Sequence, residues 1–281
     1  MGSYLKYSRK RISRHALRNL LWTRHTLSLT VQSLNLPVVS KLLERIVVKQ
    51  LLTHLDMHQL LPRLQSAYRS KHSTETALVK VISDILLATD AGDLAALVLL
   101  DLSTAFDTVD HGILLRRLET FGLNGIPLRW FKSYLVGRRQ HVRTTASFST
   151  PTVIVCGVPQ GSVLGLILFL LYIADLQSLI EHCDLRPHDF ADDTQIYGFC
   201  SPLTSSCAAL QSRISECIDA VSSWMKSNRL QLNTAKTEII WLATGRRVYV
   251  RCQRNLSASA LIKSHQLLWF VILGSTSTVI C

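Results

Sequence analysis

Apolar residues follow the periods of helices and strands between about residues 36 and 247. Thr74–Ala91 has an apolar residue at every third or fourth position, which predicts an amphipathic helix. Gly92 follows it, as is common where a helix ends. Leu94–Leu100 is then apolar without interruption, which predicts a strand buried on both faces. Both periods occur in one segment, so we expect a packed domain of mixed α and β structure.

The same patterns predict the other elements of this domain. Further helices are expected at 41–54, 111–121, 127–135 and 162–180. Pro127 would be the first residue of one, and Ser162 would cap another. A last long helix is marked by apolar residues at helical spacing: Leu210, Ile214, Ile218, Val221 and Trp224/Met225. Strands are expected at 152–156, at 188–191 and 194–199 around a tight turn at Asp192-Asp193, and in a closing hairpin of 230–232 with 238–243.

Both ends of the chain depart from this organisation. Residues 1–35 are rich in Lys and Arg, and the first acidic residue of the chain is Glu44. Three interpretations stay open for this basic arm: a contact with nucleic acid, a mitochondrial-type presequence, or translated sequence that lies outside the functional reading frame. Residues 248–281 are rich in Ser and Thr, and Leu267–Leu273 is their one substantial apolar run. We expect both ends to be poorly ordered and to pack poorly on the 36–247 core.

Composition narrows the class of protein. Apolar residues make up 48% of the 281 positions, enough to bury a sizeable core. The 31 Lys and Arg exceed the 19 Asp and Glu, which gives a net charge of +12 and indicates a polyanionic partner, either nucleic acid or an anionic membrane surface. Cysteine spacing shows no C-x-x-C pair, so neither a zinc site nor a disulfide framework is indicated. The longest apolar run, Val163–Ala174, is too short to span a bilayer and predicts a buried core helix.

Three aspartates carry the candidate chemistry. Asp101 ends the predicted buried strand, where a charge is costly unless it binds something. Asp192 and Asp193 lie at the predicted hairpin turn, where acidic residues are common for structural reasons. A hairpin beside the strand would place Asp101 and Asp192 side by side. Clustered carboxylates without a neutralising lysine nearby in sequence favour hard cations such as Mg²⁺, and two such ions about 4 Å apart serve phosphoryl transfer.

Six segments, in this order, resemble motifs of LINE-type (non-LTR) retrotransposon reverse transcriptases. They are Gln65–Ala77 (a fingers motif), Leu99–His111 (motif A), Trp130–Arg138 (the stretch between motifs A and B), Gly157–Gly165 (motif B), Phe190–Tyr197 (motif C) and Trp224–Glu238 (motif D). The resemblance extends over about residues 38–247. It departs from the family after Gly165, where the usual proline is missing, and no segment resembles an endonuclease domain.

This resemblance implies an α+β fold, a right-hand polymerase palm in which helices back a small antiparallel sheet. Residues 36–92 would be partial fingers and residues 93–247 the palm. Residues 1–35 would be a separate basic arm. Residues 248–281 would be an atypical tail that cannot form a thumb, which would therefore be absent or degenerate.

The resemblance also assigns roles to single residues. Asp101, Asp192 and Asp193 would be the catalytic carboxylates and would ligate two Mg²⁺ ions, for which Mn²⁺ is an alternative. Phe106 would exclude a ribose 2′-hydroxyl, with an ordinary core aromatic as the other interpretation. The remaining nucleotide-binding candidates are Gln160 and Gly161, which precede a helix with free N–H groups, Arg69 on the triphosphate, and Lys236 on the departing pyrophosphate.

The implied function is RNA-directed DNA polymerisation, with an RNA template, a DNA primer and a dNTP as partners. Neither a membrane nor an obligate protein partner is indicated, and we expect an intracellular location, nuclear or cytoplasmic. The alternative is a catalytically inactive retroelement remnant that acts at most as a basic nucleic-acid-binding protein.

Overall fold

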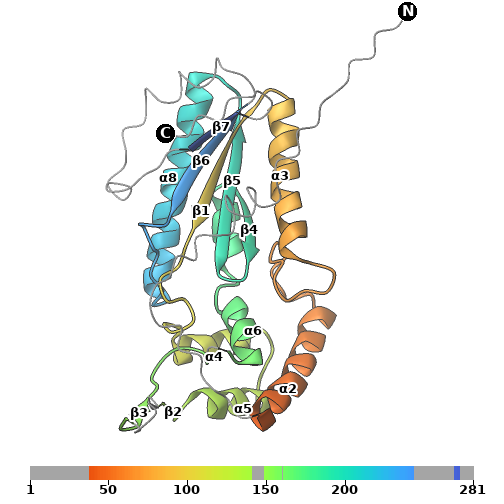
Figure 1. The fold of residues 1–281 in the computed structure, drawn as a ribbon, viewed down its shortest axis with the longest axis vertical. Coiled ribbons are helices and arrows are strands. Elements are labelled where there is room, and N and C mark those ends of the chain that lie inside the picture. Colours follow the sequence, from red (N-terminus) through yellow and green to blue (C-terminus); the bar gives the residue numbers. More distant parts are fainter. Residues whose placement is uncertain (1–37, 141–148, 160, 244–268, 273–281) are drawn as a thin grey trace, which may run out of the picture. The chain divides into compact units, whose positions relative to one another are not determined.

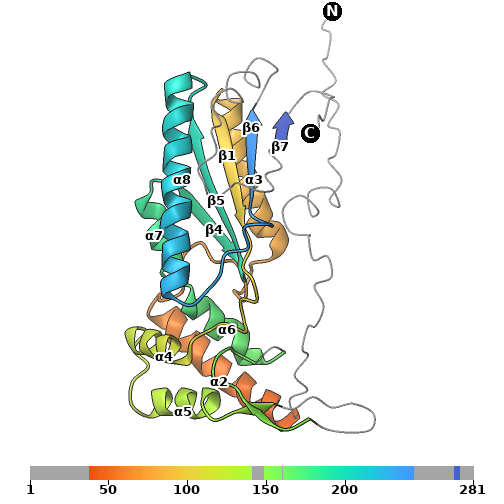
Figure 2. The same cartoon turned by 90° about the vertical axis from the view of Figure 1, so that its left-hand side faces the viewer.

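A five-stranded sheet between helices dominates the computed structural model (Figures 1 and 2). The structure describes residues 38–140, 149–159, 161–243 and 269–272, and these belong to one compact unit, residues 32–281. The predicted basic arm, Gln160 and most of the predicted tail lie outside the described residues.

The sheet has the strand order β4-β5-β1-β6-β7, so β1 lies at its centre. Its strands are β1 (Leu94–Leu100), β4 (Arg186–Phe190), β5 (Asp193–Cys200), β6 (Glu238–Ala243) and β7 (Trp269–Ile272). All neighbours pair antiparallel except β6 and β7, which are parallel. The bounds of β1 are those that its apolar run predicts, because a central strand buries both of its faces.

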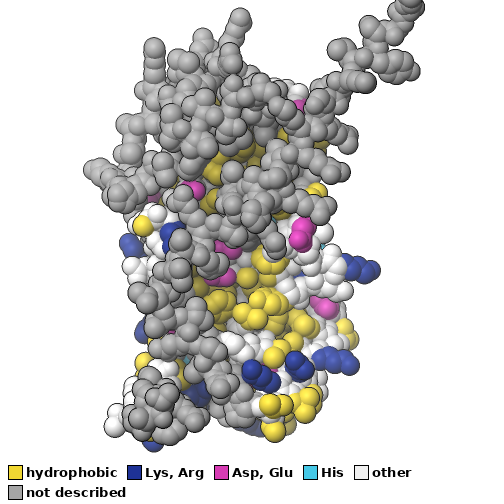
Figure 3. Space-filling view, viewed as in Figure 1, with side chains coloured by type: hydrophobic (Ala, Val, Ile, Leu, Met, Phe, Trp, Pro, Cys, Tyr) yellow, Lys and Arg dark blue, Asp and Glu magenta, His cyan; other side chains and the backbone are white. Residues whose placement is uncertain are grey.

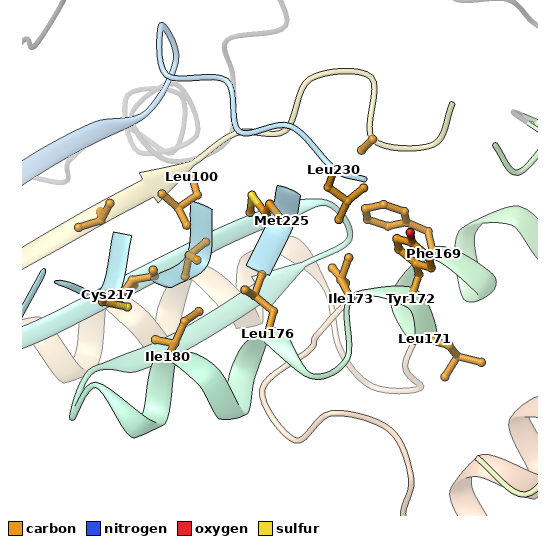
Figure 4. Packing of buried hydrophobic residues seen from close by; sticks show 14 of the residues in the cluster. Leu100, Phe169, Leu171, Tyr172, Ile173, Leu176, Ile180, Cys217, Met225 and Leu230 are labelled. Atoms are coloured by element: carbon orange, nitrogen blue, oxygen red, sulfur yellow. The ribbon is translucent and has the colours of Figure 1, made fainter. Parts of the chain in front are cut away.

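Helices cover both faces of the sheet, which is why β1 tolerates no polar position. On one face lies α3 (Thr74–Asp90), where Tyr197 of β5 donates a hydrogen bond from its hydroxyl to Asp84 Oδ2 at 2.8 Å. On the other face lie α7 (Leu176–His182) and α8 (Thr204–Ser227), as Figure 2 shows. Figure 4 shows this second interface, with Leu100 of β1 packed among apolar side chains: Leu176, Ile180, Cys217 and Met225.

A helical layer lies below the sheet in Figure 1. It consists of α2 (Val38–Met57), α4 (His111–Thr120), α5 (Ile126–Leu135) and α6 (Val163–Tyr172), beside a short ribbon of β2 (Arg139–Gln140) and β3 (Thr152–Val153). Two details differ from the sequence predictions. Pro127 occupies the second position of α5, after the Gly125 cap, and β3 ends earlier than the predicted strand 152–156.

The predicted helix 162–180 is wrong as a single element. It divides at Ile173–Asp175 into α6 and α7. The division lets α6 pack on α2 and α4 while α7 packs on α8 and β4, which one straight helix could not do. The segment Val163–His182 meets the length and composition criteria of a membrane span, but 67% of its apolar window is buried within the structure, as expected for core helices.

The predicted hairpin of 230–232 with 238–243 is also wrong. Residues 231–233 pair instead with the chain that follows β1: Ser103 N–H donates to Gln231 O, and Asn233 N–H donates to Asp101 O, both at 2.9 Å. β6 then pairs with β1 itself. The expectation that the tail packs poorly fails for residues 269–272, which form β7 and extend the sheet beside β6.

Candidate active site

Pairing of β1 with β5 brings two of the predicted carboxylates together. The last register pair is Leu100 with Thr194, and one further step of the same register would set Asp101 opposite Asp193, whose pKa the charge of Asp101 helps to raise. The predicted turn position is off by one residue: Ala191, with a φ of 59°, and Asp192 make the turn, and Asp193 begins β5. The predicted convergence of the Asp101 and Asp192 carboxylates stays a prediction.

The charges of Asp192, Asp101 and Lys236 all act on Asp193. Burial, together with the nearby carboxylates of Asp192 and Asp101, raises the pKa of Asp193 to about 7, and the charge of Lys236 acts in the opposite direction. Lys236 Nζ lies 3.6 Å from Asp101 Oδ2. No lysine lies near these aspartates in sequence, but the fold brings one to them. Lys236 is distant in sequence, but the segment leading into β6 carries it to the end of β1.

Asn233 orients Asp101, a role that the sequence reasoning missed. Its Nδ2 donates to Asp101 Oδ2 at 2.9 Å while its backbone N–H donates to Asp101 O, also at 2.9 Å. One residue thereby fixes both the backbone and the carboxylate of Asp101. The only sign of this role in the sequence was that Asn233 lies in the segment that resembles motif D. The contact itself could not be predicted from a local pattern, because Asn233 and Asp101 are 132 positions apart in the chain.

The donor chemistry of the three aspartates suits a hard divalent cation. Carboxylate oxygens are the ligands that Mg²⁺ prefers, and the crowding that raises the pKa of Asp193 is what a bound cation would relieve. Within the described ranges, however, no three His, Cys, Asp or Glu side chains lie close enough together to form a metal site as they stand. The residue types therefore fit the predicted ions, while the two-metal geometry stays a prediction.

Phe106 lies between the site and the core. Its half-buried ring stacks at a tilt of 47° on Phe169 of α6, with 4.8 Å between centroids. Its carbonyl accepts a hydrogen bond from Val158 N–H at 2.8 Å. These contacts match the core-aromatic interpretation, and the role against ribonucleotides stays a prediction.

The glycine turn before α6 packs directly on the loop that carries Phe106. Gly157 has a φ of 89°, and a Cβ there would lie 2.9 Å from Asp107 O. Its N–H donates to Val109 O at 2.7 Å, and its carbonyl lies 2.8 Å from His111 Nε2. Only glycine fits this conformation and this approach, which accounts for its place in the motif.

The predicted free N–H groups at the start of α6 are wrong. Glu44 of α2, only 1% exposed, accepts hydrogen bonds through Oε2 from Val163 N–H at 2.7 Å and from Leu164 N–H at 3.5 Å. Ser162 Oγ accepts from Gly165 N–H, so the predicted cap is confirmed. Gly161 is exposed, with a φ of 77°. The α6 terminus therefore binds a buried carboxylate of the chain itself.

The loop before α3 carries Arg69, the predicted triphosphate contact, and Tyr68 beside it. Arg69 Nη1 donates to three loop carbonyls, those of Pro62, Arg63 and Gln65, so its contact with a triphosphate stays a prediction. Tyr68 is 45% exposed, and its pKa is raised by burial and by the charge of Asp192. The aromatic neighbour of Arg69 is thus the side chain that this loop presents toward Asp192.

Comparison with known proteins agrees with the motif resemblance. The family described as reverse transcriptase (RNA-dependent DNA polymerase) matches residues 32–266. The RNA-directed DNA polymerase from mobile element jockey of Drosophila melanogaster is 30% identical over 72% of this chain and 22% of its own length. The probable RNA-directed DNA polymerase from transposon X-element of the same species is 37% identical over 50% of this chain and 15% of its own length. The probable RNA-directed DNA polymerase from transposon BS, also of that species, is 31% identical over 71% of this chain and 22% of its own length.

The chain thus spans about a fifth of the length of these relatives. Among solved structures, telomerase from Candida tropicalis in complex with a fragment of telomeric RNA shares the fold, with a TM-score of 0.53 and 13% identity. That match covers 73% of this chain and 34% of the telomerase chain. A C-terminally truncated apo form gives a TM-score of 0.52, 12% identity, and coverage of 73% and 41%. The chain therefore belongs to the reverse transcriptase family and is related to the RNA-directed DNA polymerases of non-LTR retrotransposons.

Proposed function

We propose that this chain is the RNA-directed DNA polymerase core of a LINE-type retroelement. The reaction is attack of a primer 3′-hydroxyl on the α-phosphorus of a dNTP, with release of pyrophosphate and with RNA as template. One observation supports the proposal: β1 and β5 pair up to Leu100 and Thr194, directly before Asp101 and after Asp193, and the charges of Asp192, Asp101 and Lys236 all act on Asp193.

Each residue of the centre has a part in this reaction. Asp101, Asp192 and Asp193 would hold Mg²⁺, or Mn²⁺ in its place, which when bound neutralises charge on the attacking and leaving oxygens. Asn233 keeps the Asp101 carboxylate oriented. Lys236, whose side chain is 39% exposed, can move from Asp101 to the departing pyrophosphate and neutralise it. Phe106 would crowd the sugar 2′ position.

The domain assignment follows from the same residues. The sheet with α7 and α8 would be the polymerase palm, within 93–247, and residues 36–92 would be partial fingers. The surplus of 12 positive charges suits a template and primer. Figure 3 shows Lys and Arg side chains over the lower part of one face, and in α2 the side chains of Arg45 and Lys49 are exposed.

The test is primer extension on an RNA template with Mg²⁺ and dNTPs. Asp101→Asn keeps the shape of the side chain and removes a charge, so extension should fall by several orders of magnitude. Asp219→Asn is the matched control, since Asp219 is exposed on α8, and should extend at the wild-type rate. Extension by Asp101→Asn at the wild-type level would refute the assignment of the site.

A second candidate function is binding of nucleic acid without catalysis. It is favoured by the lack of a ready metal cluster among the described residues. A wild-type chain that binds primer–template with the same affinity as Asp101→Asn, and extends it with neither Mg²⁺ nor Mn²⁺, would establish this alternative.

A further inference from the structure

We propose that Gln65 is a positioning residue that holds the catalytic turn and ties it to the loop before α3. This inference rests on the proposed function, because it concerns how Asp192 is placed for that reaction. Gln65 belongs to the segment that resembles the fingers motif, and neither the motif comparison nor the geometry of the aspartates gives its side chain a role.

The side-chain amide of Gln65 forms hydrogen bonds with both the N–H and the carbonyl of Ala191. Gln65 Oε1 accepts from Ala191 N–H at 3.1 Å, and Gln65 Nε2 donates to Ala191 O at 3.3 Å. The same Oε1 accepts from Ala67 N–H at 2.9 Å. The side chain is only 3% exposed, so water does not compete for these groups. One amide thus links the loop at 65–67 to the residue that precedes Asp192.

Ala191 needs such support. Its φ of 59° lies in the left-handed region, which alanine adopts only at a cost of about 1 kcal/mol or more. Asp192 and Asp193 follow directly, so the direction in which Asp192 leaves the turn depends on this conformation. By satisfying both the N–H and the carbonyl of Ala191, Gln65 stabilises the conformation that presents Asp192 beside Asp193.

The chemistry requires an amide of this length. The N–H of Ala191 needs an acceptor and its carbonyl needs a donor. The side chain of glutamine carries both at the end of the chain Cβ–Cγ–Cδ. Methionine has a similar length and shape but offers no N–H donor and only a weak acceptor. Gln65→Met therefore removes the hydrogen bonds with Ala191 and keeps the packing of a side chain of similar size at position 65.

The chain offers a matched control in Gln177 of α7. This glutamine is also buried, at 5% exposed, and acts on the same neighbourhood: its Oε1 accepts from Leu64 N–H at 3.1 Å, and its Nε2 donates to Asp189 Oδ2 at 2.6 Å. Among the described residues, the side chain of Gln177 makes no hydrogen bond with Ala191. Gln177→Met should thus cost comparable stability without releasing the turn.

The first experiment needs no catalytic activity. Hydrogen exchange resolved at single amides should show the Ala191 N–H protected in the wild-type chain and in Gln177→Met. In Gln65→Met that amide should exchange at least 10-fold faster. Rapid exchange of Ala191 in the wild-type chain would refute the proposal, even if Gln65→Met failed to fold. Equal protection of Ala191 in both variants would refute it as well.

The second experiment is steady-state primer extension with a Mg²⁺ titration. In Gln65→Met we expect kcat to fall by about 100-fold, as a small misplacement of a reacting group can cause. The Mg²⁺ concentration for half-maximal rate should rise by about 10-fold, with little change in the KM for dNTP. Gln177→Met should change neither the Mg²⁺ requirement nor kcat by more than a few fold. Equal losses in both variants, with unchanged Mg²⁺ dependence, would make Gln65 merely structural.

The two experiments separate this proposal from the proposed function. If the wild-type chain extends no primer, the polymerase assignment fails, and the exchange of the Ala191 amide still decides whether Gln65 holds the turn. If the wild-type chain extends primers but Ala191 is unprotected, the polymerase assignment stands and the role of Gln65 is refuted.

Discussion

His188 and Asp189 are neighbours on β4, and burial shifts their pKa values in opposite directions. Burial lowers the pKa of His188 to about 4 and raises the pKa of Asp189 to about 6. Both shifts have the same cause, since a low-dielectric site disfavours the charged form of either group. Alternation along the strand sends the two side chains to opposite faces: His188 meets Ser66, and Asp189 meets Gln177 of α7. The folded state therefore keeps His188 neutral.

This gives a pH prediction. The pKa of His188 is lower in the folded state than the ordinary value of about 6.5, so the unfolded chain binds the proton more tightly. Folding stability that depends on neutral His188 is present above pH 6.5 and is lost as the pH falls toward 4. Between pH 7 and pH 5, the wild-type chain should lose roughly 2 kcal/mol more unfolding free energy than His188→Gln.

Urea denaturation of both chains at the two pH values is the measurement. His182→Gln, which replaces an exposed histidine, is the control and should follow the wild type at both pH values. Asp189 titrates in the opposite sense in both chains, so it cancels in the comparison. A difference between the wild type and His188→Gln that does not change with pH would contradict the buried neutral histidine.

At the level of elements, the start of α6 depends on a residue from another helix. Glu44 of α2 binds the N-terminal N–H groups of α6 and accepts from Tyr134 Oη of α5 at 3.1 Å. A carboxylate at a helix N-terminus also compensates the positive end of the helix dipole. One buried acid therefore joins three helices of the layer that supports the Gly157 turn.

We accordingly expect Glu44→Gln to lower the free energy of unfolding by about 1–3 kcal/mol, because a charged acceptor shared by several donors is replaced by a neutral amide. Chemical denaturation measures this. Glu216→Gln on the exposed side of α8 is the matched control and should change stability by less than about 0.5 kcal/mol. A Glu44→Gln chain as stable as this control would show that the buried carboxylate contributes nothing.

At the scale of the whole molecule, the proposed function makes charge the main force that would hold a template and primer. The chain carries a net charge of +12, and its contacts with phosphates would release counterions. If contacts of Lys and Arg with phosphates supply most of the binding free energy, the affinity for primer–template falls steeply with salt. Each binding event then ends after few nucleotides have been added.

The expected result is that primer–template affinity falls roughly 10³-fold or more between about 50 and 200 mM salt, with a linear log–log dependence. The products should be short, because the protein dissociates after few additions. Primer extension should be strongest at low ionic strength. Fluorescence anisotropy with a labelled primer–template measures the affinity, and a trap oligonucleotide reports the products of one binding event. An osmotically matched sucrose series is the control. Long products from a single event at physiological salt would contradict this account.

Local patterns were enough for most elements. The run Leu94–Leu100 has no polar interruption, so its burial and its extended form followed from composition alone. The apolar stripe of α3 was equally explicit: it predicted a helix over Thr74–Ala91, and the structure has one over Thr74–Asp90. The division of 162–180 could not be read from the sequence, because an apolar run carries no mark where two different packing surfaces begin.

For the site, the sequence by itself determined the residue types: the aspartates at strand ends, the glycine turn and the motif order that placed the chain in its family. Only the tertiary structure decided which groups meet. The β1–β5 register brings the strand ends before Asp101 and after Asp193 together, and chain segments more than a hundred positions away bring Asn233 to Asp101 and Gln65 to Ala191. Periodicity reports the local environment of a residue, whereas such contacts depend on how distant strands pair, which no local pattern encodes.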